Sequence, residues 1–223
     1  MRRANNMPPL FEIASGAARC DQHRTVVFAY DVRCSRRSFR VRRALQTVQT
    51  AAQYSVFETW LTPTERRDLL AELTSHMEMN EDRLAVWSPC KQTRVEVRKA
   101  KARSNTVRVV SRASITRCGD SVLAESWAGC GNSIVCYDIR DVDRLRAVAA
   151  AVASVTVAVQ RSVYWLRAGW KDTNAIIRKL GELLDDDDSL WIYPLAHAGD
   201  LWRIQPSVSA MLPIGTEQRF DKR

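Results

Sequence analysis

The stretch YDVRCSRRSFRVRRAL, from Tyr30 to Leu45, follows an apolar run at residues 26–29 and holds one acidic residue among six arginines. A related stretch, YDIRDVDRLRAV, begins at Tyr137, 107 positions further along the chain. An apolar run followed by a cationic segment with helical periodicity is typical of a buried strand and an amphipathic helix. The recurrence predicts that the chain contains the same unit twice.

The alignment of the two units extends well beyond these stretches. At the same offset, AQYSVF at residues 52–57 falls on VQRSVY at residues 159–164. With one gap, EDRLAVWSP at residues 81–89 falls on DDSLWIYPL at residues 187–195. A register held over this length predicts a tandem duplication.

Each unit has the same predicted order of elements: a strand ending in Tyr-Asp, a helix, a strand pair, a second helix and a last strand. In the first unit, the apolar face of the first helix is expected at Val41, Ala44, Leu45 and Val48. The second helix begins at TPTE, with Thr62 as N-cap, Pro63 at the first helical position and Glu65 closing a capping box. The β-α-β-β-α-β order predicts an α+β protein of two tandem ferredoxin-like domains.

We expect five segments along the chain. They are an N-terminal extension (1–24), a first ferredoxin-like domain (25–97), a basic linker with strand content (98–131), a second ferredoxin-like domain (132–206) and a C-terminal tail (207–223). Around the linker, TRVEVRK and NTVRVVSR alternate as strands do, and DLWRI is the expected counterpart after the second unit.

The net charge of +9 is concentrated in the first half of the chain. Residues 1–120 hold 22 Lys and Arg against 12 Asp and Glu, whereas residues 121–223 hold 12 against 13. Attraction for a polyanion therefore lies in the N-terminal half, and nucleic acid is the expected partner. Solubility alone is the alternative explanation of the charge.

Two further features bear on the compartment. The longest apolar run, residues 147–159, is too short to cross a bilayer, and the N-terminus has no apolar signal-peptide core, so we expect a cytoplasmic protein. The six cysteines show no C-x-x-C spacing and are expected to be reduced thiols. A zinc site that uses Cys118 and Cys130 is the alternative.

Taken in order, these segments resemble CRISPR-associated protein two, the small ferredoxin-fold partner of the CRISPR spacer integrase. The matching features are the strand ending in Tyr30-Asp31, the arginine-bearing helix, QYSVFE, the LTPTE helix start and the final strand LWIYPL, over about residues 25–89 and 132–205. Members of this family are usually single domains that form dimers by adding a late strand to the partner's sheet. The resemblance implies a covalent pseudo-dimer in which the linker and DLWRI supply the exchanged strands.

The resemblance also implies a role for the aspartate that ends the first strand. In the family it binds a divalent metal between protomers, so Asp31 and Asp138 are candidate catalytic residues and metal ligands that face each other across a pseudo two-fold axis. Mg²⁺, or Mn²⁺, would activate a water for phosphodiester cleavage. The alternative is that each aspartate caps the next turn or pairs with nearby arginines.

Cations on the first helix and in the linker are the candidate nucleic-acid contacts, because arginines at helical spacing can follow a phosphate backbone. The predicted contacts are Arg33, Arg36, Arg37, Arg40, Arg43, Lys91, Arg94, Arg98, Lys99, Lys101, Arg140 and Arg144. The alternative for the helix is a solvated face. In the second unit most of the stripe is replaced by Asp or Ala. We expect the first unit to be weighted toward DNA. The second unit, including the acidic run at residues 185–188, is then weighted toward integrase docking or spacing, although this run more simply solvates a loop.

The function expected first is that of an adaptor in CRISPR spacer acquisition, part of antiviral defence. It would bridge integrase subunits and hold the double-stranded prespacer for insertion into the CRISPR array. A second hypothesis is a metal-dependent endonuclease that acts alone on RNA or DNA. A third, an RNA-recognition module, fits the fold outline but lacks the aromatic strand motif that stacks bases.

Overall fold

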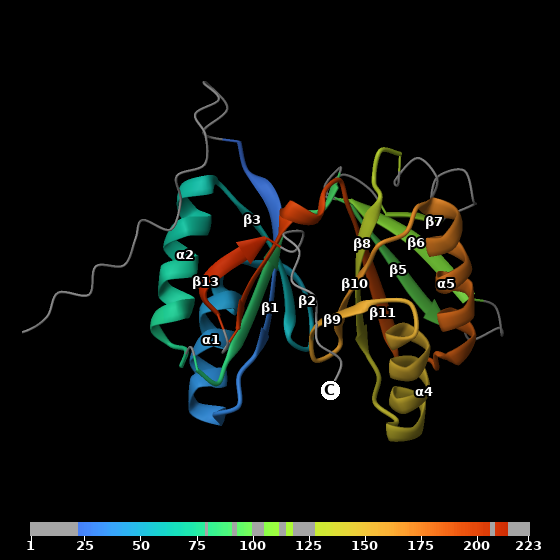
Figure 1. Cartoon of the computed structure of the whole chain (residues 1–223), viewed down its shortest axis with the longest axis horizontal. Coiled ribbons are helices and arrows are strands. Elements are labelled where there is room, and N and C mark those ends of the chain that lie inside the picture. The colour runs from blue at the N-terminus through green and yellow to red at the C-terminus, as the bar shows by residue number, and fades with distance from the viewer. Residues whose placement is uncertain are drawn as a thin grey trace, which may run out of the picture.

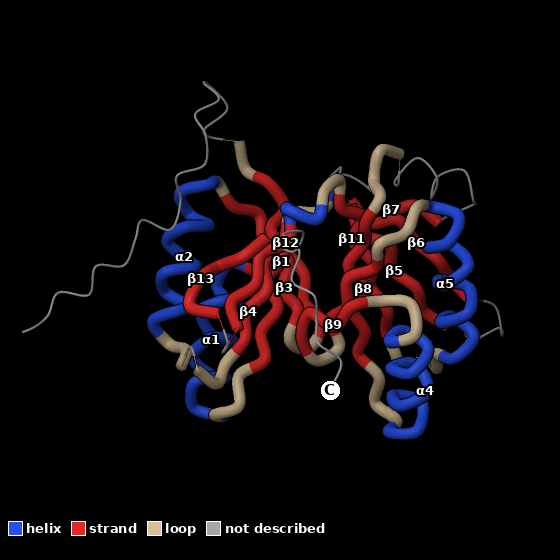
Figure 2. Tube along the Cα trace, in the orientation of Figure 1, coloured by secondary structure: helices blue, strands red, loops and turns tan. Residues whose placement is uncertain are grey.

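The computed structural model describes residues 22–78, 80–90, 93–99, 105–111, 115–117, 128–205 and 208–213. Two antiparallel sheets face each other, and two helices cover the outer face of each sheet (Figures 1 and 2). The predicted α+β fold of two tandem ferredoxin-like units is confirmed.

The first unit follows the predicted β-α-β-β-α-β order. Its elements are β1 (Arg24–Asp31), α1 (Ser35–Val48), β2 (Gln49–Gln53), β3 (Val56–Leu61), α2 (Pro63–Ser75) and β4 (Arg83–Trp87). The predicted capping box opens α2: the backbone N–H of Glu65 donates to Thr62 Oγ1 at 3.2 Å, and the backbone N–H of Thr62 donates to Glu65 Oε2 at 2.7 Å. This start positions the apolar face of α2, with Leu69, Leu70 and Leu73, against the sheet.

The second unit repeats the first element by element. It consists of β8 (Asn132–Asp138), α4 (Val142–Ala153), β9 (Val157–Gln160), β10 (Val163–Leu166), α5 (Trp170–Leu183) and β11 (Ser189–Leu195). The hairpins that follow α1 and α4 are equivalent, since Ser55 and Ser162 accept a hydrogen bond at 3.2 Å from the backbone N–H of Tyr30 and Tyr137, respectively. The turn residues Tyr54 and Arg161 therefore occupy corresponding positions.

The strands that follow each unit are exchanged. After β4 come β5 (Thr93–Lys99), β6 (Asn105–Ser111) and β7 (Ile115–Arg117), and after β11 come the 3-10 turn η2 (Ala198–Asp200), β12 (Leu201–Gln205) and β13 (Val208–Pro213). The first sheet has the order β13-β12-β4-β1-β3-β2, and the second has the order β7-β6-β5-β11-β8-β10-β9. The strand exchange expected of a covalent pseudo-dimer is confirmed, because β5 pairs with β11 and β12 pairs with β4.

Three apolar layers hold the molecule together. Outer layers lie between each helix pair and its sheet, and a third lies between the two sheets. In this middle layer the Trp87 and Tyr193 rings meet edge to face with centroids 5.5 Å apart, and both residues are fully buried. Full burial of a Val, Leu or Ile side chain in this layer stabilises the assembly by about 1.5–3 kcal/mol. The two units are thus joined by a continuous core as well as by the exchanged strands.

None of the helices in the described part of the chain is both long and apolar enough to cross a membrane.

Candidate functional site

The strands β1 and β8 end in aspartates at the same edge of the packed sheets (Figure 1). Asp31 and Asp138 are both partly exposed, while the five residues before each are buried. Within the sheets, Asp31 is paired in register with Arg83, and Asp138 is paired with Ser189. The edge therefore gathers both predicted metal ligands, but in chemically different surroundings.

Asp31 lies in a pocket to which both units contribute. The pocket has a volume of about 380 Å³ and is lined by Asp31, Val32, Arg33, Glu81, Arg83 and Arg161. Arg161 comes from the β9–β10 turn of the second unit. Within the described residues, the guanidinium groups of Arg33, Arg83 and Arg161 have neither a hydrogen bond nor an ion pair. The pocket thus presents three unpaired positive side chains against two carboxylates.

These surroundings do not fit a divalent cation at Asp31. Mg²⁺ and Mn²⁺ take several oxygen ligands, whereas three guanidinium groups beside one carboxylate repel a cation. In the part of the chain that the structure describes, no group of three or more His, Cys, Asp and Glu side chains could hold a metal ion. Asp138 does not line the Asp31 pocket. A metal shared by Asp31 and Asp138 stays a prediction, and the described residues provide no further ligands for it.

The carboxyl group of Asp138 has a pKa above the ordinary aspartate value. Burial raises the pKa of this carboxyl; Arg140 lowers it and the nearby Asp188 raises it, with a net shift above the ordinary value. The charges that act on it come from its own unit.

A buried carboxylate fixes the start of the first helix. Asp82, whose residue is fully buried, accepts hydrogen bonds from the backbone N–H of Arg33 at 3.2 Å and of Glu78 at 2.8 Å. Arg37 Nε donates to the same carboxylate at 2.8 Å and a terminal nitrogen of Arg37 bonds Glu81 at 2.6 Å. Burial raises the pKa of Asp82, but these hydrogen bonds outweigh it, and the net pKa lies below the ordinary value.

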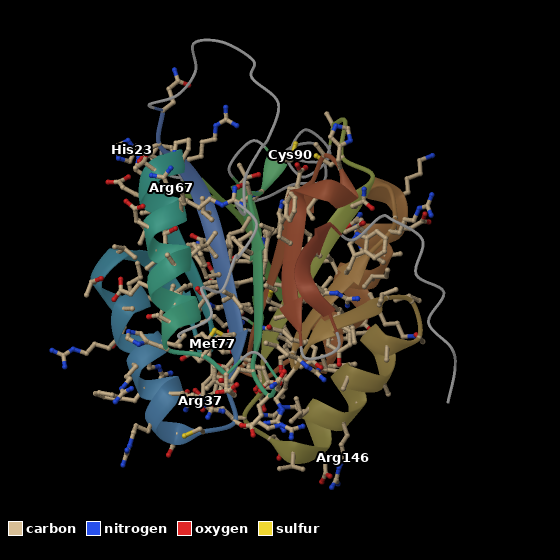
Figure 3. The ribbon with its side chains drawn as sticks, turned by 60° about the vertical axis from the view of Figure 1, so that its left-hand side comes forward. His23, Arg37, Arg67, Met77, Cys90 and Arg146 are labelled. Carbon is tan, nitrogen blue, oxygen red and sulfur yellow. The ribbon has the colours of Figure 1, made fainter. Side chains whose placement is uncertain are left out.

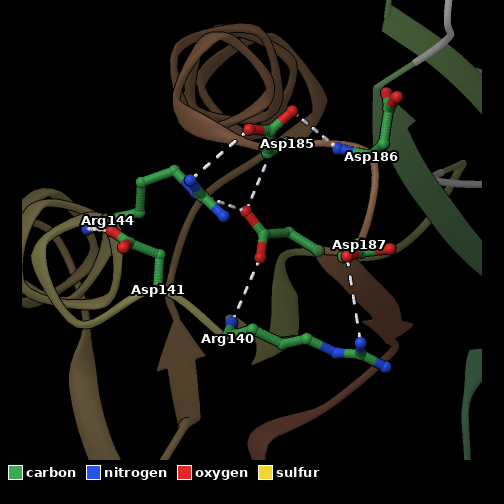
Figure 4. A network of polar contacts seen from close by, with 7 residues as sticks. Arg140, Asp141, Arg144, Asp185, Asp186 and Asp187 are labelled. Atoms are coloured by element: carbon green, nitrogen blue, oxygen red, sulfur yellow. Dashed lines mark hydrogen bonds and ion pairs between the residues drawn. The ribbon is translucent and has the colours of Figure 1, made fainter.

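The second unit repeats this arrangement with Asp188 (Figure 4). Asp188, 1% exposed, accepts from the backbone N–H of Arg140 at 3.2 Å, from Arg144 Nε at 2.8 Å and from the backbone N–H of Asp185 at 2.8 Å. The acidic run was expected to solvate a loop, and for Asp188 that expectation is wrong because its carboxylate lies inside the fold. The neighbouring Asp187 is exposed and lies 3.8 Å from Arg140.

The predicted nucleic-acid contacts on the helices separate into paired and unpaired groups. Arg37 and Arg144 hold Asp82 and Asp188, so they position the helices, and Arg37 lies at the same end of the molecule as Arg146 of α4 (Figure 3). The unpaired group is exposed on α1, without an ion pair among the described residues, and consists of Arg36, Arg40 and Arg43. We call these three residues the α1 stripe. In α4 their counterparts are Asp143, Ala147 and Ala150, so the stripe exists only in the first unit.

Of the predicted nucleic-acid contacts in the linker, the structure describes the side chains of Arg94 and Arg98, and both are paired. Arg94 on β5 is only 11% exposed; it bonds Glu58 of β3 and lies 4.2 Å over the Trp191 ring. The Arg94 guanidinium therefore connects the two units in the interior. It is no longer a candidate nucleic-acid contact. Arg98 pairs with Glu96 and remains half exposed. The side chains of Lys91, Lys99 and Lys101 lie outside the described residues, as does Cys118 of the alternative zinc site.

A pair of glutamines completes the boundary between the units. Gln53 Nε2 donates to the backbone oxygen and Oγ of Ser189 at 2.9 and 2.6 Å, so it crosses from the first unit to the second. Its counterpart Gln160 is 4% exposed, and neither atom of its amide has a hydrogen-bond partner in the described structure. Gln160 directly precedes Arg161, so the pseudo-symmetry is broken at the Asp31 pocket.

A family model described as CRISPR associated protein Cas2 matches residues 24–97 and again residues 132–208, the two repeated units. The chain belongs to the Cas2 family. This membership assigns it to a CRISPR system. The double match also confirms two Cas2 copies in one chain, as predicted from the internal repeat.

Individual proteins that resemble this Cas2-family chain include one curated protein and one solved structure. A protein named CRISPR-associated endoribonuclease Cas2 2, from Nitrosomonas europaea, is 42% identical over 60 residues, which cover 27% of this chain and 53% of that protein. The match thus spans about half the length of the relative. The crystal structure of the hypothetical protein TT1823 from Thermus thermophilus shares 24% identity over 30% of this chain and 83% of its own, with a TM-score of 0.30.

Asp82, Arg83 and Arg161 were absent from the sequence prediction, and Asp188 entered it only as part of the acidic run. Asp82 and Asp188 fall on each other in the repeat alignment, and shared acids just before a strand are the signal that would have singled them out. Arg83 and Arg161 give no such signal, since their counterparts are Ser189 and Tyr54. Only the face-to-face packing of the two sheets brings Arg83 and Arg161 together.

Proposed function

We propose that this Cas2-family chain is a structural DNA-binding adaptor of the CRISPR spacer-acquisition complex. It bridges subunits of the spacer integrase, CRISPR-associated protein one, and holds the prespacer duplex for insertion into array DNA. The observation that carries the proposal is the set of arginines without an ion pair among the described residues: the α1 stripe together with the pocket residues Arg33, Arg83 and Arg161. Unpaired guanidinium groups on a rigid frame suit phosphate contacts without base recognition.

The frame supports an adaptor in a second way. Strand exchange and the apolar layer between the sheets fix the spacing of the two units, and fusion makes their association independent of concentration. A rigid spacer of this kind can set the distance between two bound integrase subunits. The role is geometric and electrostatic, and the partner performs the strand transfer.

The test combines the intact chain with a labelled DNA duplex and with the cognate integrase. Fluorescence anisotropy at several salt concentrations measures the affinity, and gel filtration measures assembly with integrase. The adaptor role predicts salt-dependent duplex binding and a ternary complex. Absence of both duplex binding and integrase binding would overturn it.

A metal-dependent endonuclease acting on RNA or DNA is the second candidate. It is favoured by the aspartate that ends the first strand in both copies and by the name of the Nitrosomonas relative. Mg²⁺ or Mn²⁺ would supply the activated water if Asp31 and Asp138 held it, but the arginines at Asp31 speak against this. Incubation of end-labelled RNA and DNA with Mg²⁺, Mn²⁺ or EDTA decides the matter: metal-dependent cleavage lost in Asp31→Asn and Asp138→Asn would establish the enzyme.

A further inference from the structure

Asp31 and Asp138 occupy equivalent positions in the two units, and we call their surroundings the two edge sites. The two edge sites differ in the sign of their net charge. At Asp31, Arg33, Arg83 and Arg161 face two carboxylates, and one of these, Glu81, is already held by Arg37 at 2.6 Å. Around Asp138, the corresponding residues are Arg140, Asp187 and Ser189, and Arg140 is paired with Asp187 (Figure 4). Arginines outnumber carboxylates at the first site, and carboxylates outnumber arginines at the second.

The corresponding turn residues Arg161 and Tyr54 also have different surroundings. Arg161 reaches the pocket of the other unit, whereas its counterpart Tyr54 lies in its own unit beneath Arg42, whose guanidinium carbon is 5.7 Å from the ring centroid. Gln53 closes the second site by its hydrogen bonds to Ser189, while Gln160 beside Arg161 has both amide atoms unbonded in the described structure.

We propose that the Asp31 pocket binds a single backbone phosphodiester at the middle of the duplex, and that the corresponding site at Asp138 does not. This inference rests on the proposed DNA-binding function and adds that the two units bind the duplex unequally. Three forked donors around an open volume suit a phosphate rather than a metal. The pocket lies where the two units meet, so a duplex that crosses both units places its central phosphates there. Because the Asp138 site has no counterpart of Arg83 or Arg161, the chain binds one strand of the duplex at its centre and not the other.

The variants that test this exchange each arginine for the residue that its counterpart uses, so the fold already tolerates the replacement. Arg83→Ser and Arg161→Tyr are each expected to weaken binding of a 5′-hydroxyl duplex about tenfold at 0.1 M salt and to reduce the slope of log K against log salt by about 0.9. Arg140→Ser, an arginine-to-serine control in the second unit, is expected to change the affinity by less than about twofold because the nearby carboxylates of Asp138 and Asp187 offset the charge of Arg140. Asp31→Asn is expected to strengthen duplex binding in EDTA, because it removes a negative charge beside the phosphate. If a metal ion instead bridged Asp31 and the phosphate, Asp31→Asn would weaken duplex binding in Mg²⁺.

A palindromic duplex with methylphosphonate at its central step counts the pockets directly. With one pocket, substitution in one strand costs about twofold, since the duplex can turn to present the other strand, and substitution in both costs about tenfold. Two equivalent pockets would give about tenfold and about a hundredfold instead, and would overturn the proposal.

The remaining outcomes are also distinct. If the wild-type chain binds no duplex, the proposed function fails. If it binds duplex but Arg83→Ser and Arg161→Tyr change nothing, only this inference fails. Binding that requires a 5′-phosphate would contradict the central phosphodiester, because the pocket would then take a strand end.

Discussion

Arg161 of the second unit and Asp31 of the first unit line one pocket, although the chain separates them by 130 positions. The shared pocket depends on the face-to-face packing of the two sheets, which the strand exchange maintains. In a dimer of identical chains, any change in the turn would alter both edge sites at once. Fusion of two copies removes that constraint, and here the two sites have diverged in charge.

Asp82→Asn is predicted to lower the free energy of unfolding by about 2–3 kcal/mol at pH 7, since the buried carboxylate accepts four hydrogen bonds, from Arg33, Arg37 and Glu78. Chemical denaturation measures the change. Glu81→Gln, the control, removes only an exposed partner of the same arginine and is expected to cost less than about 1 kcal/mol.

The same residue predicts a pH dependence. Because the folded-state pKa of Asp82 is lower than the ordinary value, its contribution is complete above the ordinary aspartate pKa and is lost as the pH falls through the folded value. The acid limb of the stability curve should therefore be shallower in Asp82→Asn than in the wild type. Parallel acid limbs would show that Asp82 is not linked to folding in this way.

Arg94→Ala is predicted to destabilise the chain by about 3–5 kcal/mol, because it leaves the Glu58 carboxylate buried with Tyr193 as its other partner. Arg98→Ala removes a half-exposed member of the adjacent pair and is expected to cost less than about 1 kcal/mol. Thermal or chemical unfolding compares the two. Equal effects would contradict the assignment of Arg94 to the interior.

Much of the fold could be predicted from the sequence because the repeat, the capping box at Thr62 and the alternation in the linker are local patterns. Strand exchange could be predicted from the family resemblance. The roles of Arg94 and Arg161 could not, since a cation in a basic linker or a turn looks solvated until a partner sheet covers it. The buried state of Asp188 was hidden within a run of four aspartates, where sequence alone does not tell which one turns inward.

The α1 stripe predicts an asymmetric response to charge reversal. Replacement of Arg36 and Arg40 by Glu is expected to weaken duplex binding at least tenfold more than replacement of the same number of arginines, Arg140 and Arg146, by Glu, since each lost phosphate contact is worth about tenfold at 0.1 M salt. Arg144 is left out of the control because it holds the buried Asp188. Equal losses in anisotropy titrations would show that both units grip the duplex alike.

Asp138→Asn is predicted to stabilise the chain at neutral pH. The folded-state pKa of Asp138 is raised, so the ionised carboxylate destabilises the folded protein, and this penalty develops as the pH rises from the ordinary aspartate pKa through the folded value. Denaturation at pH 7 should show the variant to be more stable, with the gain shrinking toward pH 3. A less stable variant at pH 7 would mean that the charge at Asp138 is compensated in the fold.

The most direct test of the adaptor role is an integration assay. Purified chain, cognate integrase, a short DNA duplex and a CRISPR array are combined, and the wild type is compared with the Asp31→Asn/Asp138→Asn double variant. The adaptor account predicts full spacer insertion by the double variant, because both aspartates are dispensable when the chain acts through geometry and charge. Loss of insertion in a variant that still folds and binds DNA would contradict it and would establish a catalytic part for the two aspartates.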